Sequence, residues 1–414
     1  MAIATPSNQV RWLQVWSLAS VQGAISLTWI AYGLYLPKFI AEVFAYPVEQ
    51  AQQFAAILLV IEGAIGIIVE PLFGSLSDRW QRWYSSRMPM IVAGTIAATA
   101  IFIGLPSLVI FGGANDFTRL LLPSLAVLWA IAMSTFRSPV ICLLASFAGA
   151  TQLPLAGSVL TLVGGFVASI RPLATKFILS LGAPATFAIA SIALLAGVAG
   201  LRSAMAHIPK QLNPSSDQSL TTISRFWLNL AIVMFVGATI GLGIRLLMGE
   251  VVPRTIRTDL ISFTGLSFEI LLGSALITQA LLALITGQIS KLIDNKRLMI
   301  FSLGGIVAGL ILLSLGYGAI ASILIILLIL FCLSAVNNGM IAFALTMVPS
   351  SLGGLTIGMF FGGLSGAIAI FGYLVPQSSI ITTPNVILLN AIVFLSAGIA
   401  IALGKKITNN SEPV

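Results

Sequence analysis

Two carboxylates lie within one apolar stretch of the sequence, VIEGAIGIIVEPLFG, at Glu62 and Glu70. An ionisable side chain at the centre of a bilayer costs about 2.5–3.5 kcal/mol on insertion scales, so it usually faces a partner or a water-filled cavity. On a helix, Glu62, Gly66, Glu70 and Gly74 form a single polar stripe of small and acidic residues. We therefore expect Glu62 and Glu70 to bind a proton or a monovalent cation.

Basic residues in other apolar runs are the expected partners of these carboxylates. Arg137 lies at about the depth of Glu70, so an ion pair that breaks when Glu70 is protonated is one interpretation, and a static clamp is the other. Arg171 is deep enough to face a cavity, and we expect it to be a second ion-pair partner. We expect Lys176 and Arg245 to extend toward the membrane interface.

Polar and aromatic residues on two other runs are candidates for a substrate cavity. Gln22, Trp29 and Tyr32 share roughly one face of the first run. Asn337 and Asn338 lie within an uninterrupted apolar run, where amides need hydrogen-bond partners. These two amides either form hydrogen bonds between helices or contact a substrate, and the sequence does not decide between the two.

The composition shows what must position these residues. The chain has 414 residues, of which 58% are hydrophobic and only 8% charged, and its mean hydropathy is +1.08. Soluble domains have roughly 25% charged residues. Lipid must therefore surround most of this chain, and the spanning elements must be helices or a closed barrel.

Twelve apolar runs of helical length predict an all-α membrane protein. The runs are 12–37, 52–73, 88–111, 120–147, 154–180, 184–203, 226–249, 264–288, 298–316, 320–346, 353–376 and 384–403. One long polar interruption divides them into six and six. We expect an N-terminal six-helix bundle (1–205), a central loop (206–225), a C-terminal six-helix bundle (226–404) and a tail (405–414).

The charge distribution predicts the orientation and excludes several classes of protein. The net charge of +8 comes from Lys and Arg in short inter-helix loops, which argues against nucleic-acid binding and places both termini in the cytoplasm of a cell-membrane protein. Cys142 and Cys332 lie in apolar runs, and His207 lies in the central loop. We find no residue pattern typical of a metal site, a cofactor site or an enzyme active site, and no nucleotide-binding loop. We expect the protein to be a monomer.

The turn GSLSDRWQRW (74–83) resembles the signature of the major facilitator superfamily, Gly-x-Leu-x-Asp-Arg-x-Gly-Arg-Lys. Gly74, Asp78, Arg79 and Arg82 are in register with it, as is Leu76, whereas Gln81 and Trp83 depart from it. GQISKLIDNKR (287–297) is a weak second copy. The resemblance implies two pseudo-symmetric six-helix bundles and a conformational latch made by Gly74, Asp78, Arg79 and Arg82.

A narrower resemblance points to glycoside-pentoside-hexuronide:cation symporters, the branch of the melibiose and sucrose carriers. It rests on Ser77-Asp78-Arg79 followed by Arg87 and Pro89. The fourth run departs from that branch, because its Arg137 precedes Pro139 where the branch has Pro before Arg.

A ladder of glycines marks the eleventh run. Gly354, Gly358, Gly362 and Gly366 recur every four residues, which allows close helix approach. In the family that the chain resembles, this helix packs on helix 2, so the ladder would meet the stripe of Glu62 and Glu70. Shallow surfaces suit a contact that rearranges, and a static tight contact is the alternative.

These observations together predict a secondary transporter of a small organic solute, working by alternating access and coupled to a proton or another cation as a symporter. One alternative is a proton-coupled exporter of amphipathic compounds. The other is a non-transporting membrane assembly factor that binds pigment or lipid.

Overall fold

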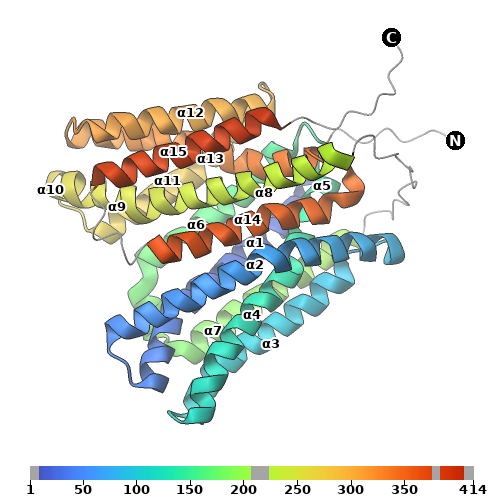
Figure 1. The fold of residues 1–414 in the computed structure, drawn as a ribbon, viewed down its shortest axis with the longest axis vertical. Helices are drawn as coiled ribbons and strands as arrows, with labels where there is room; N and C mark the ends of the chain where they lie inside the picture. The colour runs from blue at the N-terminus through green and yellow to red at the C-terminus, as the bar shows by residue number, and fades with distance from the viewer. Residues whose placement is uncertain (1–8, 207–222, 375–382, 405–414) are drawn as a thin grey trace.

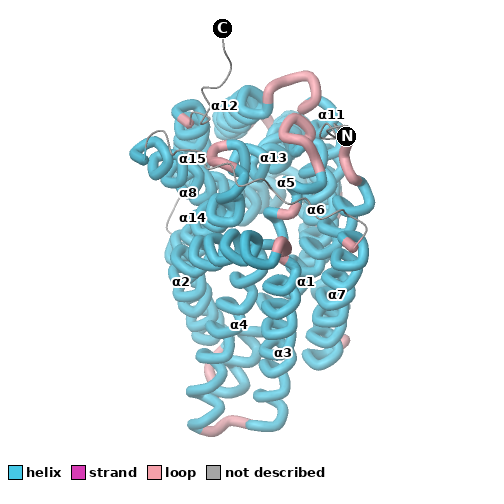
Figure 2. Tube along the Cα trace, turned by 90° about the vertical axis from the view of Figure 1, so that its right-hand side faces the viewer, coloured by secondary structure: helices cyan, strands magenta, loops and turns pink. Residues whose placement is uncertain are grey.

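The computed structural model describes residues 9–206, 223–374 and 383–404 of the chain. Within these ranges the chain is helical, without strands (Figure 2). Twelve of the described helices are long and apolar enough to cross a bilayer, which confirms the predicted all-α membrane class and its twelve spans. Most of the predicted central loop, including His207, and the predicted tail from residue 405 lie outside the described residues.

The helices follow one another with short connections. The first half comprises α1 (Trp12–Phe44), α2 (Val48–Tyr84), α3 (Met88–Gly112), α4 (Asp116–Cys142), α5 (Leu144–Phe147), α6 (Leu153–Ser180) and α7 (Gly182–Met205). The second half comprises α8 (Ile223–Leu246), η1 (Leu247–Val251), α9 (Val252–Thr255), η2 (Ile256–Leu260), α10 (Ile261–Thr264), α11 (Phe268–Ile289), α12 (Asn295–Ser314), α13 (Ala319–Thr346), η3 (Ser350–Leu352), α14 (Gly353–Leu374) and α15 (Thr383–Leu403).

Polar residues in the turns fix where several helices begin. The Asn115 side chain accepts the N–H of Thr118 at 2.8 Å at the start of α4. Asp294 accepts the N–H groups of Lys296 and Arg297 at the start of α12. Each cap satisfies backbone donors that have no partner within the first turn.

The seventh span is longer than the sequence predicted. The apolar run was expected to end at residue 249, but helical structure continues to Thr264 through the π-helical turns η1 and η2. The N–H of Val252 donates to the carbonyl of Leu247, five residues back, and the next residue, Pro253, has no N–H to donate. Glu250 and Arg254 then form an ion pair of 2.9 Å along this helix, so the predicted loop is helical instead.

The two halves form separate groups of helices that meet along a few of their members. In Figure 1 the second half lies above the first, with α14 next to α2 between them. The halves contact each other chiefly through α2 against α14 and through α6 against α11 and α13, with α4 also touching α14. Each half thus contributes helices to a central seam, which is where a site between the halves must lie.

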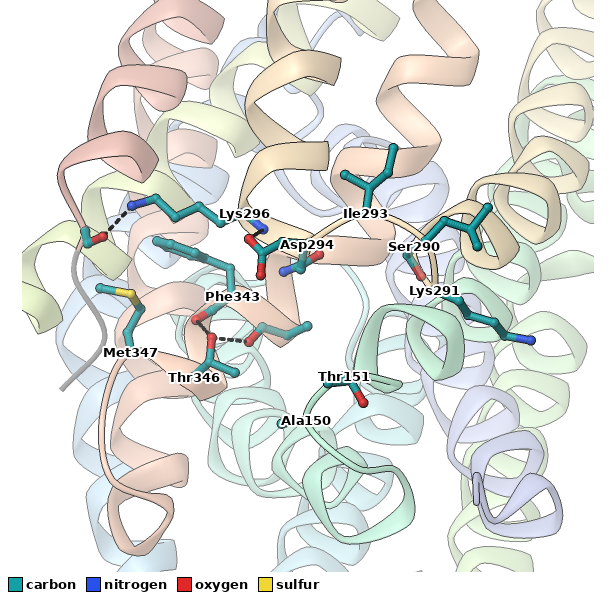
Figure 3. A pocket seen from close by; sticks show the side chains of 14 residues that line it. Ala150, Thr151, Ser290, Lys291, Ile293, Asp294, Lys296, Phe343, Thr346 and Met347 are labelled. Carbon is teal, nitrogen blue, oxygen red and sulfur yellow. Dashed lines mark hydrogen bonds between the residues drawn. The ribbon is translucent and has the colours of Figure 1, made fainter. Parts of the chain in front are cut away.

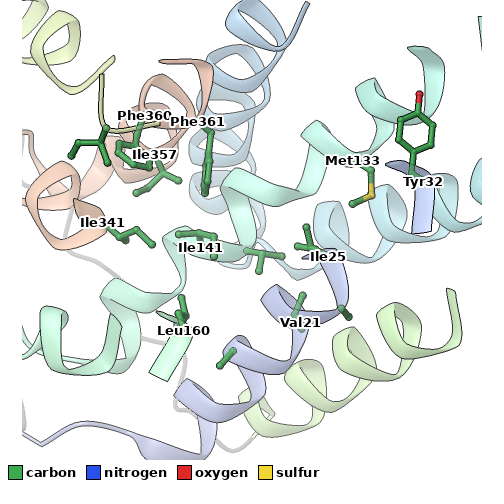
Figure 4. Packing of buried hydrophobic residues seen from close by; sticks show 14 of the residues in the cluster. Val21, Ile25, Tyr32, Met133, Ile141, Leu160, Ile341, Ile357, Phe360 and Phe361 are labelled. Carbon is green, nitrogen blue, oxygen red and sulfur yellow. The ribbon is translucent and has the colours of Figure 1, made fainter. Parts of the chain in front are cut away.

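We call the two ends of the bundle the Asp78 end and the Arg257 end. At the Asp78 end, apolar side chains of both halves belong to one buried cluster (Figure 4). Ile141 and Leu160 come from the first half, and Ile341 and Ile357 come from the second. These four buried side chains form the part of that cluster that closes the seam at the Asp78 end.

Candidate functional site

Asp78 joins the two halves through the backbone of α14. Its carboxylate oxygens accept the N–H groups of Gly354 and Leu355, each at 2.8 Å. These are the first donors of a 22-residue helix, whose N-terminus favours a negative charge. Asp78 is only 1% exposed, so these bonds are shielded from water.

The arginine that completes this contact is Arg87. Its guanidinium donates to Asp78 at 2.6 Å and to the Ser77 hydroxyl at 2.8 Å. Arg79 and Arg82, the predicted arginines of the latch, are exposed and make no ion pair among the described residues. The latch role predicted for Arg79 and Arg82 therefore stays a prediction, which the contacts in this conformation do not support.

The reason lies in the turn that follows α2. Ser85 has a left-handed backbone (φ 52°), and the chain reverses there, so Arg87 returns to the face that carries Asp78. Arg79 follows Asp78 directly on the helix and therefore points to another face. The spacing of Arg87 and Pro89 after Asp78 was the sequence signal for this arginine.

The glycine ladder of α14 lies directly on α2. Gly354 lies against Gly74, and Gly358 lies against the backbone of Glu70 and Pro71. A Cβ atom at Gly362 would lie 3.0 Å from the carbonyl oxygen of Ile67, so there is no room for larger residues. The stripe of α2, with its two carboxylates, therefore faces protein rather than lipid.

Glu70 lies in a network that crosses the seam. Its carboxylate is 2.6 Å from the guanidinium of Arg137 and accepts the hydroxyl of Ser138, also at 2.6 Å. Arg137 also donates to Ser365 at 3.4 Å and lies 4.4 Å over the ring of Phe361, both on α14. One guanidinium thus holds a carboxylate of the first half and two side chains of the second.

Glu62 has a different environment, formed within the first half. The Tyr32 hydroxyl donates to one carboxylate oxygen of Glu62. The other oxygen has no hydrogen-bond partner in the described structure, and water does not replace one, because Glu62 is only 7% exposed. A buried carboxylate with a free oxygen is a group that can take up a proton.

Aromatic side chains surround this pair. The Trp129 ring lies 4.4 Å from Tyr32 and 4.7 Å from Trp29, centroid to centroid. The indole nitrogens of both tryptophans and the Gln22 carbonyl are buried without a partner in the described residues. Gln22, Trp29 and Tyr32 were predicted for the cavity, whereas Trp129, in the middle of the fourth run, was missed.

The two asparagines of α13 have separate surroundings. Asn338 is buried and donates to the Ala283 carbonyl at 2.8 Å and to the Thr286 hydroxyl at 2.9 Å, both on α11. Its amide therefore joins two helices of the second half, which is one of the two alternatives left open for it, and its place in a substrate cavity stays a prediction. Asn337 is partly exposed, and its carbonyl oxygen is buried without a partner in the described structure.

Arg171 lies at a cavity rather than in an ion pair. It makes no ion pair among the described residues, contrary to the prediction of a second pair. The cavity has a volume of about 720 Å³ and lies toward the Arg257 end, between α6 of the first half and η1 and α11 of the second. Lys176, Arg257 and Glu269 also line it.

A second cavity, of about 470 Å³, lies at the Asp78 end (Figure 3). Its polar lining groups are used to join the ends of helices. Lys296 donates to the carbonyls of Ala402 and Gly404, and Asn295 donates to that of Gly339 at 3.0 Å. This cavity is a crevice around helix ends, in which the carbonyl oxygen of the Asn295 side chain is buried without a hydrogen-bond partner among the described residues.

No family model matches the sequence, and no curated protein sequence matches it. Several solved structures are similar in fold. A bacterial homologue of the iron transporter ferroportin, in the outward-facing state, is 15% identical, with a TM-score of 0.63 over 93% of this chain and 98% of that one. The human organic anion transporter MFSD10 is 14% identical, with a TM-score of 0.65 over 96% and 100%. The proton:xylose symporter XylE of the major facilitator superfamily is 13% identical, with a TM-score of 0.67 over 95% and 96%. The chain is therefore a multi-pass membrane protein with the fold of major facilitator transporters.

Proposed function

We propose that the chain is a secondary transporter that moves a small organic solute by alternating access of its two halves. The Glu70–Arg137 network is the observation on which the proposal rests. Its guanidinium is shared between a carboxylate on α2 and side chains on α14, so a change of charge at Glu70 acts directly on the contact between the halves.

The coupling step follows from this arrangement. Protonation of Glu70 removes the negative charge that holds Arg137, and the guanidinium is then bound only by Ser365 and Phe361 of the second half. Glu62 supplies a second buried carboxylate, with one oxygen on Tyr32 and one free. We assign proton uptake to Glu62. We assign to Glu70 the step that changes the contact between the two halves in response.

The conformation described here is one of the two that alternating access requires. The seam is closed at the Asp78 end by the contact of Asp78 with α14 and by buried apolar side chains of both halves, and the larger of the two cavities described above lies toward the other end. Rocking of one half against the other would release Asp78 and open that end.

Symport is the direction we propose, because the turn after α2 resembles that of cation symporters. The similar structures support transport without identifying the solute, since one is a proton:xylose symporter, one is an organic anion transporter and one is a homologue of an iron transporter. The proposed location is the cell membrane, with the Asp78 end on the cytoplasmic side, as the basic loops predict.

Proton movement driven by a solute tests this proposal. The full chain is reconstituted in liposomes loaded with a pH-sensitive dye and exposed to a panel of sugars, amino acids, organic acids and cationic dyes. We expect at least one solute to acidify the lumen, with the signal abolished in Glu62→Gln and in Glu70→Gln. Glu49→Gln is the matched control, because Glu49 is an exposed residue in the first turn of the same helix.

The outcomes separate the candidate functions. Alkalinisation of the lumen on solute entry would indicate exchange for protons and would support the exporter instead of the symporter. Solute flux that is the same in wild type and in both glutamine variants would remove the coupling role. Absence of flux for the whole panel, with a lipid or pigment retained through purification, would support the non-transporting alternative.

A further inference from the structure

Arg245 lies near two arginines of other helices. The charge of Arg245 on α8 interacts with those of Arg171 on α6 and Arg137 on α4. Arg137 has its carboxylate partner in Glu70, but Arg171 and Arg245 have none within 4 Å among the described residues. Two of the three positive charges are thus uncompensated.

Arg245 lies near the middle of a 40-residue helical span, Arg225–Thr264. The sequence predicted that it lies at the outer end of its span and extends to the interface. Because helical structure continues from Arg245 to Thr264, roughly 28 Å of helix follows it at 1.5 Å per residue. The side chain is partly buried within the protein.

The adjoining cavity has the size and the lining of a ligand site. Its volume of about 720 Å³ falls within the range of small-molecule pockets. Met248 and Gly249, one helical turn beyond Arg245, belong to its wall together with Arg171. Leu173 and Leu272 supply apolar surface on opposite sides of the seam.

The charge of this lining is strongly one-sided. Arg171, Lys176 and Arg257 are three basic residues on the wall, against the single carboxylate of Glu269. Arg257 already lies 4.4 Å over the ring of Phe268 and has no carboxylate partner in the described structure. A cation or a neutral sugar gains nothing from such a wall, whereas an anion is attracted from the mouth inward.

We propose that the solute is a small organic anion, whose carboxylate, sulfonate or phosphate group is bound by Arg171 in the cavity between the two halves, with the positive charge of Arg245 one helical turn from the cavity wall. Arginine suits this role because its planar guanidinium donates two parallel hydrogen bonds to such oxyanions. The anion also supplies the compensating charge that two arginines within a membrane require. This inference rests on the proposed transport function for its biological sense, but the binding itself is measured without flux.

Binding of matched solutes to the purified full chain tests the inference. The probes are pairs of similar shape that differ in charge: benzoate with benzamide and benzamidine, succinate with succinamide, and glucose 6-phosphate with glucose. We expect at least one anion to bind, measured by calorimetry and by the shift of the unfolding temperature, and its neutral and cationic counterparts not to bind. Arg245→Gln and Arg171→Gln are each expected to lower the affinity for that anion roughly tenfold or more, because each removes a charged partner of the anion.

Two controls keep a loss of binding interpretable. Arg225→Gln removes an exposed arginine from the first turn of the same helix as Arg245 and is expected to leave the affinity unchanged. Arg245→Lys keeps the charge but loses the paired donors, so partial recovery relative to Arg245→Gln shows that the side chain acts through its charge. Unfolding temperatures without solute identify any variant that fails to fold.

Several results would overturn the inference. Equal binding of charged and neutral partners would do so, as would affinities that do not change in both glutamine variants. Stabilisation by phosphatidylglycerol vesicles alone, with no response to any soluble anion, would mean that the arginines bind a lipid headgroup. If only neutral solutes drive proton movement, the inference that the solute is an anion is refuted while the proposed transport function stands. If an anion binds but no solute is transported, the anion site stands while the proposed transport function is refuted.

Discussion

At the scale of single residues, the site consists of charges whose partners lie on other helices. Glu70 has no exposed surface and shares Arg137 with α14, so neither member of the pair can be removed without leaving a buried charge. Breaking a buried ion pair on one side costs about 3–5 kcal/mol, whereas replacing both members costs far less. The sequence indicated the pair from the depth of its two residues, but it gave no means of finding Ser365 or Phe361.

We expect Arg137→Gln to destabilise the protein more than the double variant Arg137→Gln with Glu70→Gln, because the single variant leaves the Glu70 carboxylate unpaired. The measurement is the free energy of unfolding in detergent for both single variants and the double variant. Asp116→Asn is the control, since Asp116 is fully exposed in its pair with Arg119 and its loss should change the free energy of unfolding by less than about 1 kcal/mol. Additive effects of the two single variants would contradict a coupled pair.

At the scale of helices, the close approach of α2 and α14 depends on positions without a side chain. A Cβ atom at Gly358 would meet the backbone of Glu70 and lie 2.8 Å from the Cα atom of Pro71. Four glycines at one-turn spacing predicted a close helix contact, the family resemblance implied that α2 is the partner, and apolar length predicted the twelve spans. The extension of the seventh span was not predicted, because the charged residues Glu250 and Arg254 interrupt the apolar pattern there, although they pair along a helix.

We expect Gly358→Ala to force the two helices apart and to destabilise the protein by about 1–3 kcal/mol, the usual cost of overpacking. Gly304→Ala in α12 is the matched control. Nothing lies within 4 Å of a Cβ atom at Gly304, so the better helix propensity of alanine should leave stability unchanged or raise it by up to about 1 kcal/mol. Equal behaviour of the two variants in thermal unfolding would contradict a tight contact at Gly358.

At the scale of the whole molecule, two native cysteines report on the seam. Cys142 is buried where α4 meets the start of α14, and its sulfur would lie 3.0 Å from a Cβ atom at Gly353. Cys332 is buried within the second half, against Gly305. Separation of the halves at the Asp78 end therefore exposes the first thiol and leaves the second as it is.

We expect Asp78→Asn to increase the rate at which a maleimide labels Cys142, because the substitution removes the charge that holds Arg87 and the first turn of α14. Labelling of Cys332 should not change. Asp294→Asn is the control, since Asp294 caps α12 within the second half and does not bridge the seam. Unchanged labelling of Cys142 in Asp78→Asn, measured by mass spectrometry of membranes, would show that Asp78 does not govern this closure.

The contact of Asp78 with α14 also bears on how freely the two halves can diverge in sequence. Its acceptor is a side chain, but its donors are main-chain amides, which nearly every amino acid supplies. At the Asp78 contact itself only residue 354 is constrained, because a Cβ atom there would lie 2.7 Å from an Asp78 oxygen and 2.6 Å from Arg87. Substitutions at Leu355 other than proline should thus be neutral for this contact, and a chimaera that takes α14 from a distant homologue should still close if it keeps this glycine together with Gly358 and Gly362, which lie on the backbone of α2.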